Sequence, residues 1–171
     1  PETAENVAEH YNISREDQDA FAYRSQMRTQ AAIEAGKFED ELMAITIPQR
    51  RGDDIIFDKD EHPRASTTLE GLQKLKPFVK KDGVITAGNA SGINDGAAAL
   101  LIASEVAVKE NNLKPLARIV GMQSMGVVPG MMGIGPVPAV RKLLERTGLT
   151  LEEMDVIELN EAFAAQALAV M

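Results

Sequence analysis

Near its middle the chain reads Thr86-Ala-Gly-Asn-Ala-Ser-Gly-Ile-Asn-Asp-Gly-Ala-Ala-Ala99, a stretch with no side chain larger than isoleucine. Glycine, asparagine and aspartate tolerate positive φ angles, so we expect a backbone that turns tightly here. The small side chains also leave backbone N–H and C=O groups open to a close neighbour. Two interpretations follow from the residues alone: a wall for an extended ligand, or a close crossing of two elements of the fold.

Length and composition indicate an ordinary globular chain. The 171 residues, 44% hydrophobic and 26% charged, allow one good core or parts of two. No uninterrupted apolar run approaches the length of a membrane span, so we expect no membrane partner. Cysteine is absent, so this chain itself supplies no disulfide, thiolate metal site or cysteine nucleophile.

The charge is unevenly distributed along the sequence. The formal net charge of −8 argues against general nucleic-acid binding, which requires a basic surface. Residues 37–81 contain 9 of the 18 Lys and Arg residues, balanced by 9 acidic ones, whereas residues 1–36 and 82–171 each carry −4. A polyphosphate ligand would find its partners in this middle segment. Paired charges on a solvated surface explain the same pattern without a ligand.

The first half of the chain predicts helices and one hairpin. Ser14 is placed to cap a long helix, with Asp17 as its capping-box partner, and Gly36 is placed to stop it. Thr67 and Glu70 form a second capping box. The remaining elements expected here are a short helix over 4–11, hairpin strands over 41–48 and 54–58, and a strand over 100–103.

The second half predicts alternating strands and helices. We expect helices over about 105–112 and up to Arg146, with Gly148 as the stop of the second, and a capping box of Thr150 and Glu153. Strands over 117–122 and 156–159, with a helix after each, predict a βαβ unit with parallel pairing. Ligands meet the carboxyl ends of such strands, where Asn160 would lie. The first residue is not an initiator, and the last helix has no cap, so we expect a fragment.

A charged loop precedes the Thr67 box. It offers four potential metal ligands, but their spacing fits no zinc or EF-hand pattern, which favours a solvated loop: Asp58, Asp60, Glu61 and His62. We therefore predict no metal site.

Three stretches together resemble one family, the thiolases, which cleave 3-ketoacyl-CoA with coenzyme A or condense two acyl-CoAs in reverse. They are Thr86–Ala99, Met132-Gly-Ile-Gly-Pro-Val-Pro-Ala139 and Asn160-Glu-Ala-Phe-Ala164. Thr3–Ala8 and Asp17-Gln-Asp-Ala-Phe21 are similar to thiolase sequence as well. The charged loop, with the threonines after it, most resembles bacterial degradative members such as 3-oxoadipyl-CoA thiolases.

The resemblance implies an α/β protein with a layered αβαβα fold. Residues 1–85 would be most of the loop domain that covers coenzyme A, 86–115 the end of the N-terminal core domain, and 116–171 the start of the C-terminal one. Coenzyme A would be a substrate, with no further cofactor. The whole protein would be a cytoplasmic homo-oligomer, a dimer or a tetramer.

The resemblance also assigns coenzyme A contacts. Ser91 would hydrogen-bond the pantetheine arm, with Ala87 and Gly88 lining the same channel. Arg64 would approach the adenine and phosphate end. Some thiolases have a second serine in the loop-domain contact, where this chain has Gly71. On pattern alone, Ser91 could satisfy a turn and Arg64 could be a surface charge.

Three further residues would face the acyl group. The resemblance implies that Met132 and Phe163 line its pocket, and that Asn160 holds a water that donates to the thioester oxygen, an oxyanion-hole role. On pattern alone, Met132 and Phe163 could be core residues and Asn160 the N-cap of the final helix.

The catalytic groups of the family are missing from this stretch. Thiolases use a nucleophilic cysteine, a second cysteine as acid and base, and a histidine in a Gly-His-Pro motif, whereas His62-Pro63 here follows a glutamate. The first hypothesis is therefore a portion of a thiolase whose cysteines and histidine lie outside these residues. The alternative is a non-catalytic, thiolase-derived module that binds acyl-CoA or another subunit.

Without a thiolate to attack the thioester, the purified 171-residue polypeptide is expected to show no thiolytic turnover. Measurable CoA-dependent cleavage of acetoacetyl-CoA by this polypeptide alone would contradict the assignment.

Overall fold

Helices provide most of the regular structure in residues 1–171, all of which the computed structural model describes. The α-helices are α1 (Glu2–His10), α2 (Arg15–Glu34), α3 (Leu69–Gln73), α4 (Glu105–Glu110), α5 (Pro136–Thr147) and α6 (Ala164–Val170). Three 3-10 helices are η1 (Glu39–Glu41), η2 (Pro129–Ile134) and η3 (Leu151–Glu153), and the strands are β1 (Ile45–Ile47) and β2 (Ile55–Phe57). None of the helices combines the length and apolarity that a membrane span requires.

The predicted helix boundaries are largely confirmed. The Ser14 hydroxyl accepts the Asp17 amide at 3.0 Å at the start of α2, and Gly36, with φ of 66°, follows its end. Gly148 ends α5 with φ of 69°, and the capping box of Thr150 and Glu153 is formed. These signals are local, so they act without the rest of the fold.

The capping box predicted for α3 is wrong by one residue. The N-cap is Thr68, whose hydroxyl accepts the Gly71 amide at 3.0 Å. Thr67 and Glu70 therefore do not form the box, and Thr67 is free to face a pocket described below.

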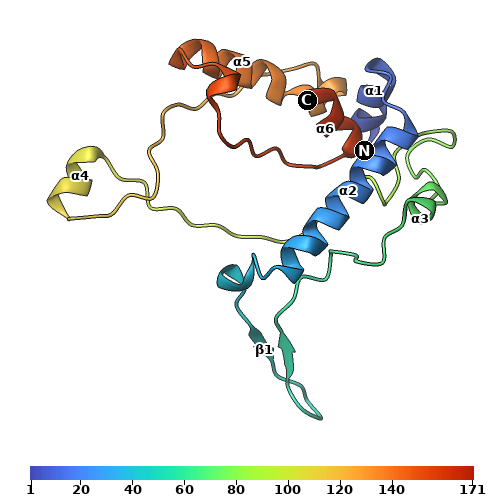
Figure 1. The fold of residues 1–171 in the computed structure, drawn as a ribbon, viewed down its shortest axis with the longest axis horizontal. Coiled ribbons are helices and arrows are strands. Elements are labelled where there is room, and N and C mark those ends of the chain that lie inside the picture. Colours follow the sequence, from blue (N-terminus) through green and yellow to red (C-terminus); the bar gives the residue numbers. More distant parts are fainter.

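The predicted hairpin is confirmed. β1 and β2 pair antiparallel, with Ile45 opposite Phe57 and Ile47 opposite Ile55. Because alternate residues of a strand share a face, these four apolar side chains lie on one face, and all are exposed. Figure 1 shows the hairpin projecting beyond the C-terminal end of α2 and η1, away from α1, α5 and α6.

The three other predicted strands are wrong for this structure. Residues 100–103, 117–122 and 156–159 have no regular structure, and the expected βαβ unit with parallel pairing is not formed. A strand exists only through hydrogen bonds to a neighbouring strand, and no other part of residues 1–171 pairs with these segments. Leu100 and Leu101 are accordingly 85% and 84% exposed.

The core is small and lies where α1 packs against η2 and α6 (Figure 1). One buried cluster joins Ala4, Ala8, Ile85 and Ala165, and a second joins Phe21 to Ala164 and Ala167. The buried carboxylate of Glu5 accepts the amides of Val84 at 3.1 Å and Ile85 at 3.0 Å, so α1 holds the segment that leads into the Thr86 stretch.

Gly83→Ala is expected to destabilise the fold. An added Cβ would lie 2.2 Å from Glu5 Oε1, so the carboxylate would have to move off the amides that it binds. We expect a loss of about 1–3 kcal/mol in the free energy of unfolding, measured by urea denaturation. Gly96→Ala is the control, because nothing lies within 4 Å of its added Cβ. Equal stabilities of the two variants would show that Gly83 has room for a side chain.

Candidate functional site

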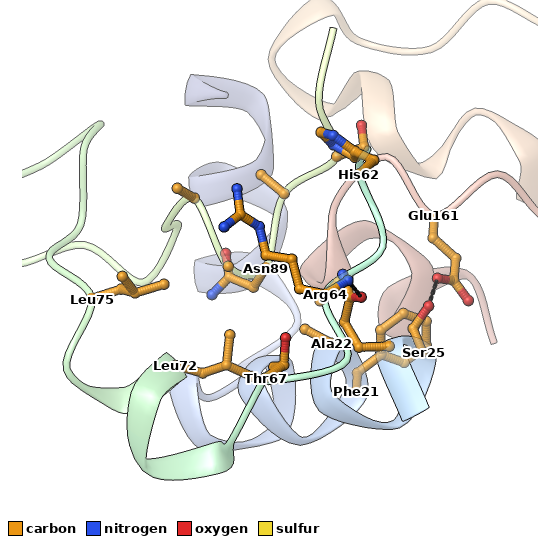
Figure 2. Close-up of a pocket in the computed structure, with 16 residues that line it drawn as sticks. Phe21, Ala22, Ser25, His62, Arg64, Thr67, Leu72, Leu75, Asn89 and Glu161 are labelled. Carbon is orange, nitrogen blue, oxygen red and sulfur yellow. Dashed lines mark hydrogen bonds between the residues drawn. The ribbon is translucent and has the colours of Figure 1, made fainter. Parts of the chain in front are cut away.

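Four segments that are distant in sequence surround one pocket of about 570 Å³ (Figure 2). One wall is the face of α2 that carries Phe21, Ala22, Ser25 and Gln26, and a second comes from the loop over 62–67 and the leucines at the end of α3. The third wall is the turn over 87–91, and the fourth consists of Glu161 and Ala164. The volume lies in the range of small-molecule sites.

Backbone hydrogen bonds join the third wall to the fourth. The Ser91 amide donates to Ala162 O at 2.9 Å, and the Ala164 amide donates to Asn89 O at 2.9 Å. Ala90 and Phe163 form an isolated antiparallel bridge between these bonds. The two sequence motifs that carry the family resemblance most clearly are therefore in direct contact, although more than 70 residues separate them.

The four predicted coenzyme A contacts all line this pocket: Arg64, Ala87, Gly88 and Ser91. The Arg64 side chain is exposed, and its amide donates to Gln26 Oε1 at 2.8 Å. The Ser91 hydroxyl is exposed and makes no hydrogen bond within the protein, so it does not satisfy the turn. Gly71, the position where the family pattern differs, does not line the pocket.

Gly88 and Gly92 of this stretch are required by close neighbours, not by left-handed backbone. Positive φ among glycines occurs only at Gly36, Gly52 and Gly148. At Gly88, an added Cβ would lie 2.5 Å from Leu72 Cδ2 and 2.6 Å from Leu75 Cδ1. The stretch therefore crosses α3 closely on one side, as one of the two interpretations predicts, and lines a pocket on the other.

None of the three residues assigned to the acyl group lines either this pocket or a second one. Phe163 is half-buried and packs on the Ala4 cluster. The second pocket, of about 480 Å³, lies between α2 and residues 157–161. Met132 in η2 is 61% exposed and lines neither pocket. Asn160 is exposed and lines neither pocket, although Leu159 lines the second and Glu161 both. The N-cap position of α6 belongs to Phe163, so Asn160 is not a helix cap.

Apart from Arg64 and Ser91, the sequence interpretation gave no pocket role to the polar residues that line this site: Ser25, Gln26, His62, Thr67, Asn89 and Glu161. The Ser25 hydroxyl donates to Glu161 Oε2 at 2.5 Å and closes one side of the pocket. His62 lies over Gly92, whose added Cβ would be 2.4 Å from its ring. One helix face carries the residues of the first wall, and their spacing in the sequence could have revealed it: Phe21, Ala22, Ser25 and Gln26. No sequence pattern distinguishes His62 from the rest of its charged loop. No cluster of side chains in residues 1–171 is arranged to hold a metal ion.

The chain belongs to the thiolase family. The family models described as the thiolase N-terminal and C-terminal domains match residues 2–106 and 113–171. A β-ketoadipyl-CoA thiolase of Acinetobacter baylyi is 62% identical over 169 residues, and an acetyl-CoA acetyltransferase of Allochromatium vinosum is 56% identical over 168. These matches cover 99% and 98% of this chain but only 42% and 43% of the relatives.

Solved thiolases have the same chain path. The acetyl-CoA acetyltransferase of Bacillus anthracis superposes with a TM-score of 0.91 at 56% identity over 99% of this chain. Human mitochondrial 3-ketoacyl-CoA thiolase in complex with CoA gives 0.88 at 55% identity over 98%. The match covers 43% and 41% of those chains. The thiolase fold is thereby confirmed, and the unpaired segments of this structure follow the course that they take in complete thiolases.

Gly92→Ala is expected to displace His62 and reshape the pocket mouth, because the added Cβ cannot coexist with the present ring position. Because His62 is exposed and its ring can rotate away, we expect a loss of no more than about 0.5 kcal/mol in unfolding free energy, measured by urea denaturation. In the double variant with His62→Ala the two changes should be non-additive, since removal of the ring leaves room for the new methyl. Strict additivity would show that the two residues do not touch.

Proposed function

We propose that this chain is the coenzyme A-facing part of a thiolase, an acyltransferase that cleaves 3-ketoacyl-CoA with coenzyme A or runs the condensation in reverse. The observation that carries the proposal is the pocket in which Arg64, Ala87, Gly88 and Ser91 converge from separate segments. A relative solved in complex with CoA follows the same path over this chain. Because the chain spans 42% of its curated relatives, the activity of the whole protein belongs to this proposal.

The chemistry of the pocket suits a pantetheine arm. The arm is narrow and carries amides, so it favours a channel with small side chains and a few hydrogen-bonding groups. Ala87 and Gly88 provide a wall of small side chains. The Ser91 hydroxyl has no hydrogen-bond partner within the protein, so it can donate to or accept from an amide of the ligand. Arg64 lies at the same pocket with an exposed guanidinium, which can pair with phosphate oxygens.

The turnover step needs groups beyond the pocket. In the proposed enzyme a cysteine outside these residues attacks the thioester, and Asn160 holds the water that donates to the oxygen on which negative charge develops. The exposed position of Asn160, directly before the segment that joins the pocket wall, supports this role. Met132 and Phe163 are proposed to line the acyl pocket.

The wider organisation follows the same proposal. Residues 1–85 would belong to the loop domain, 86–115 to the N-terminal core domain and 116–171 to the C-terminal one. Coenzyme A would be a substrate, without a further cofactor. The exposed apolar face of the hairpin supports a homo-oligomer, a dimer or tetramer, and the cysteine-free composition fits a reducing compartment such as the cytoplasm.

Two variants of the native polypeptide, meaning the protein as the cell makes it and not the isolated 171 residues, separate binding from turnover. Ser91→Ala is expected to raise the Kd for coenzyme A about 2–10-fold, the value of one hydrogen bond, with little change in kcat. Asn160→Ala is expected to lower kcat about 10²–10³-fold with an unchanged Kd. The measurements are calorimetric titration with coenzyme A and thiolysis of acetoacetyl-CoA. Ser66→Ala is the control, because this exposed serine does not line the pocket.

If the Ser91 and Ser66 variants have the same Kd for coenzyme A, this pocket is not where coenzyme A binds. Coenzyme A binding by a native polypeptide that has no thiolase turnover would favour the non-catalytic module instead.

A further inference from the structure

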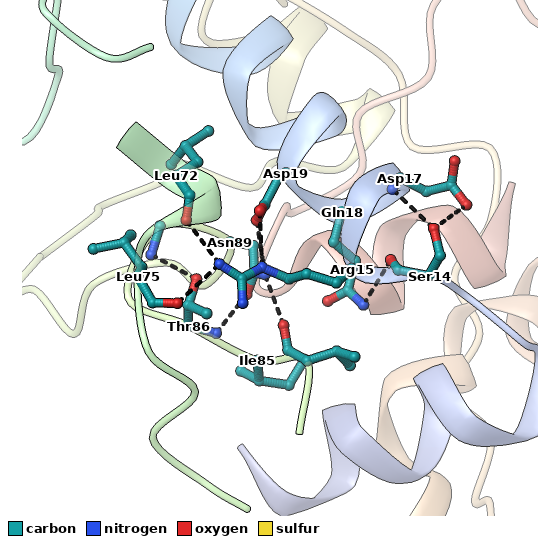
Figure 3. A network of polar contacts seen from close by, with 12 residues as sticks. Ser14, Arg15, Asp17, Gln18, Asp19, Leu72, Leu75, Ile85, Thr86 and Asn89 are labelled. Atoms are coloured by element: carbon teal, nitrogen blue, oxygen red, sulfur yellow. Dashed lines mark hydrogen bonds and ion pairs between the residues drawn. The ribbon is translucent and has the colours of Figure 1, made fainter. Parts of the chain in front are cut away.

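A buried carboxylate lies directly behind the pocket. Asp19 of α2 has no exposed surface, and both of its oxygens are used (Figure 3). Arg15 Nε donates to Oδ2 at 2.8 Å, and Asn89 Nδ2 donates to Oδ1 at 3.3 Å. A buried charge is tolerated only when it is paired and hydrogen-bonded, so these partners fix the place of Asp19.

Arg15 carries the network to α3. Its terminal nitrogen donates to Leu72 O at 2.7 Å and to Leu75 O at 3.0 Å. The last carbonyls of a helix have no partner within the helix, so the guanidinium supplies donors at the C-terminal end of α3. The planar fork reaches the carboxylate and both carbonyls at once, which a lysine cannot do. Leu72 and Leu75 are themselves wall residues of the pocket.

Asn89 carries the network to the turn. Its amide oxygen accepts the Thr86 amide at 2.8 Å, and its Nδ2 also donates to Val84 O at 2.9 Å. Its backbone carbonyl accepts the amide of Ala164. The side chain of one buried asparagine therefore closes the turn that carries Ala87, Gly88 and Ser91, and its backbone anchors the fourth wall.

We propose that Asp19 is a positioning residue that, through Arg15 and Asn89, sets the place of the coenzyme A-facing turn relative to α2 and α3; this inference rests on the proposed function. The network reaches every wall of the pocket except the charged loop over 62–67. Asn89 lines the pocket itself, and so do three residues whose backbone is bonded to the network: Leu72, Leu75 and Ala164. Asp19 makes no contact with the ligand space and acts only through its neighbours. In Asp19→Asn one of the two acceptor oxygens becomes an NH2 donor, so Arg15 and Asn89 no longer share a partner that accepts from both, and the turn is free to shift.

The test uses the native polypeptide with two variants at the network. Asp19→Asn keeps the shape and removes the charge, and Arg15→Lys keeps the charge and removes the fork. Glu105→Gln is the matched control, because Glu105 and Lys109 form an exposed i, i+4 pair at 2.7 Å that touches no pocket residue. The readouts are hydrogen exchange of the Thr86 and Ala164 amides, and the Kd and KM for coenzyme A together with kcat.

For Asp19→Asn we expect both amides to exchange at least about 10-fold faster, and the Kd and KM for coenzyme A to rise about 10-fold, with kcat at saturation changed less than about 2-fold. Arg15→Lys should give smaller changes in the same direction, and it carries the test if Asp19→Asn does not fold. Glu105→Gln should leave every readout unchanged.

Faster exchange with a wild-type Kd would overturn the positioning role, because the network would then only stabilise the fold. Unchanged exchange in both network variants would overturn it as well. If the unaltered polypeptide fails to bind coenzyme A, the proposed function falls, and the exchange rates alone decide whether Asp19 holds the turn.

Discussion

The structure depends on buried carboxylates that take the place of a neighbouring strand. The segment over 83–89 has no sheet partner, yet Ile85, Thr86 and Asn89 within it are buried and the amides of the segment need acceptors. Glu5 of α1 accepts two of them directly, and Asp19 of α2 fixes the asparagine that accepts a third. Two helices thus hold one irregular segment from opposite ends, and the pocket is built on that segment.

Close neighbours explain three glycines in and just after this segment. Gly83, Gly88 and Gly92 each face a side chain from another element, and an added Cβ at any of them would lie within 2.5 Å of it. The neighbours are a carboxylate, two leucines and an imidazole, so the glycines serve three separate contacts. Each one exists because something must come close to the backbone, which is why the stretch has the composition of a turn without left-handed residues.

What the sequence predicted correctly was mainly local. Ser14, Gly36 and Gly148 mark helix ends through bonds within a few residues, and the hairpin follows from two short apolar runs. The strands predicted over 100–103, 117–122 and 156–159 do not form, because a strand needs a partner strand and an apolar run cannot reveal whether one is present. In the site, motif resemblance found Ser91 and its neighbours, whereas His62 reaches the pocket only through a close approach to Gly92 that no spacing rule predicts.

The bond between Ala164 and Asn89 has a consequence for synthesis on the ribosome. Ala164 follows Asn89 by 75 positions, and translation adds about 5–20 residues per second. The Asn89 carbonyl and the Ser91 amide therefore remain without their final partners for about 4–15 seconds after they are made. During that interval this carbonyl and this amide are open to water or to any other strand-like segment of the nascent chain, so the pocket wall is completed only late in synthesis.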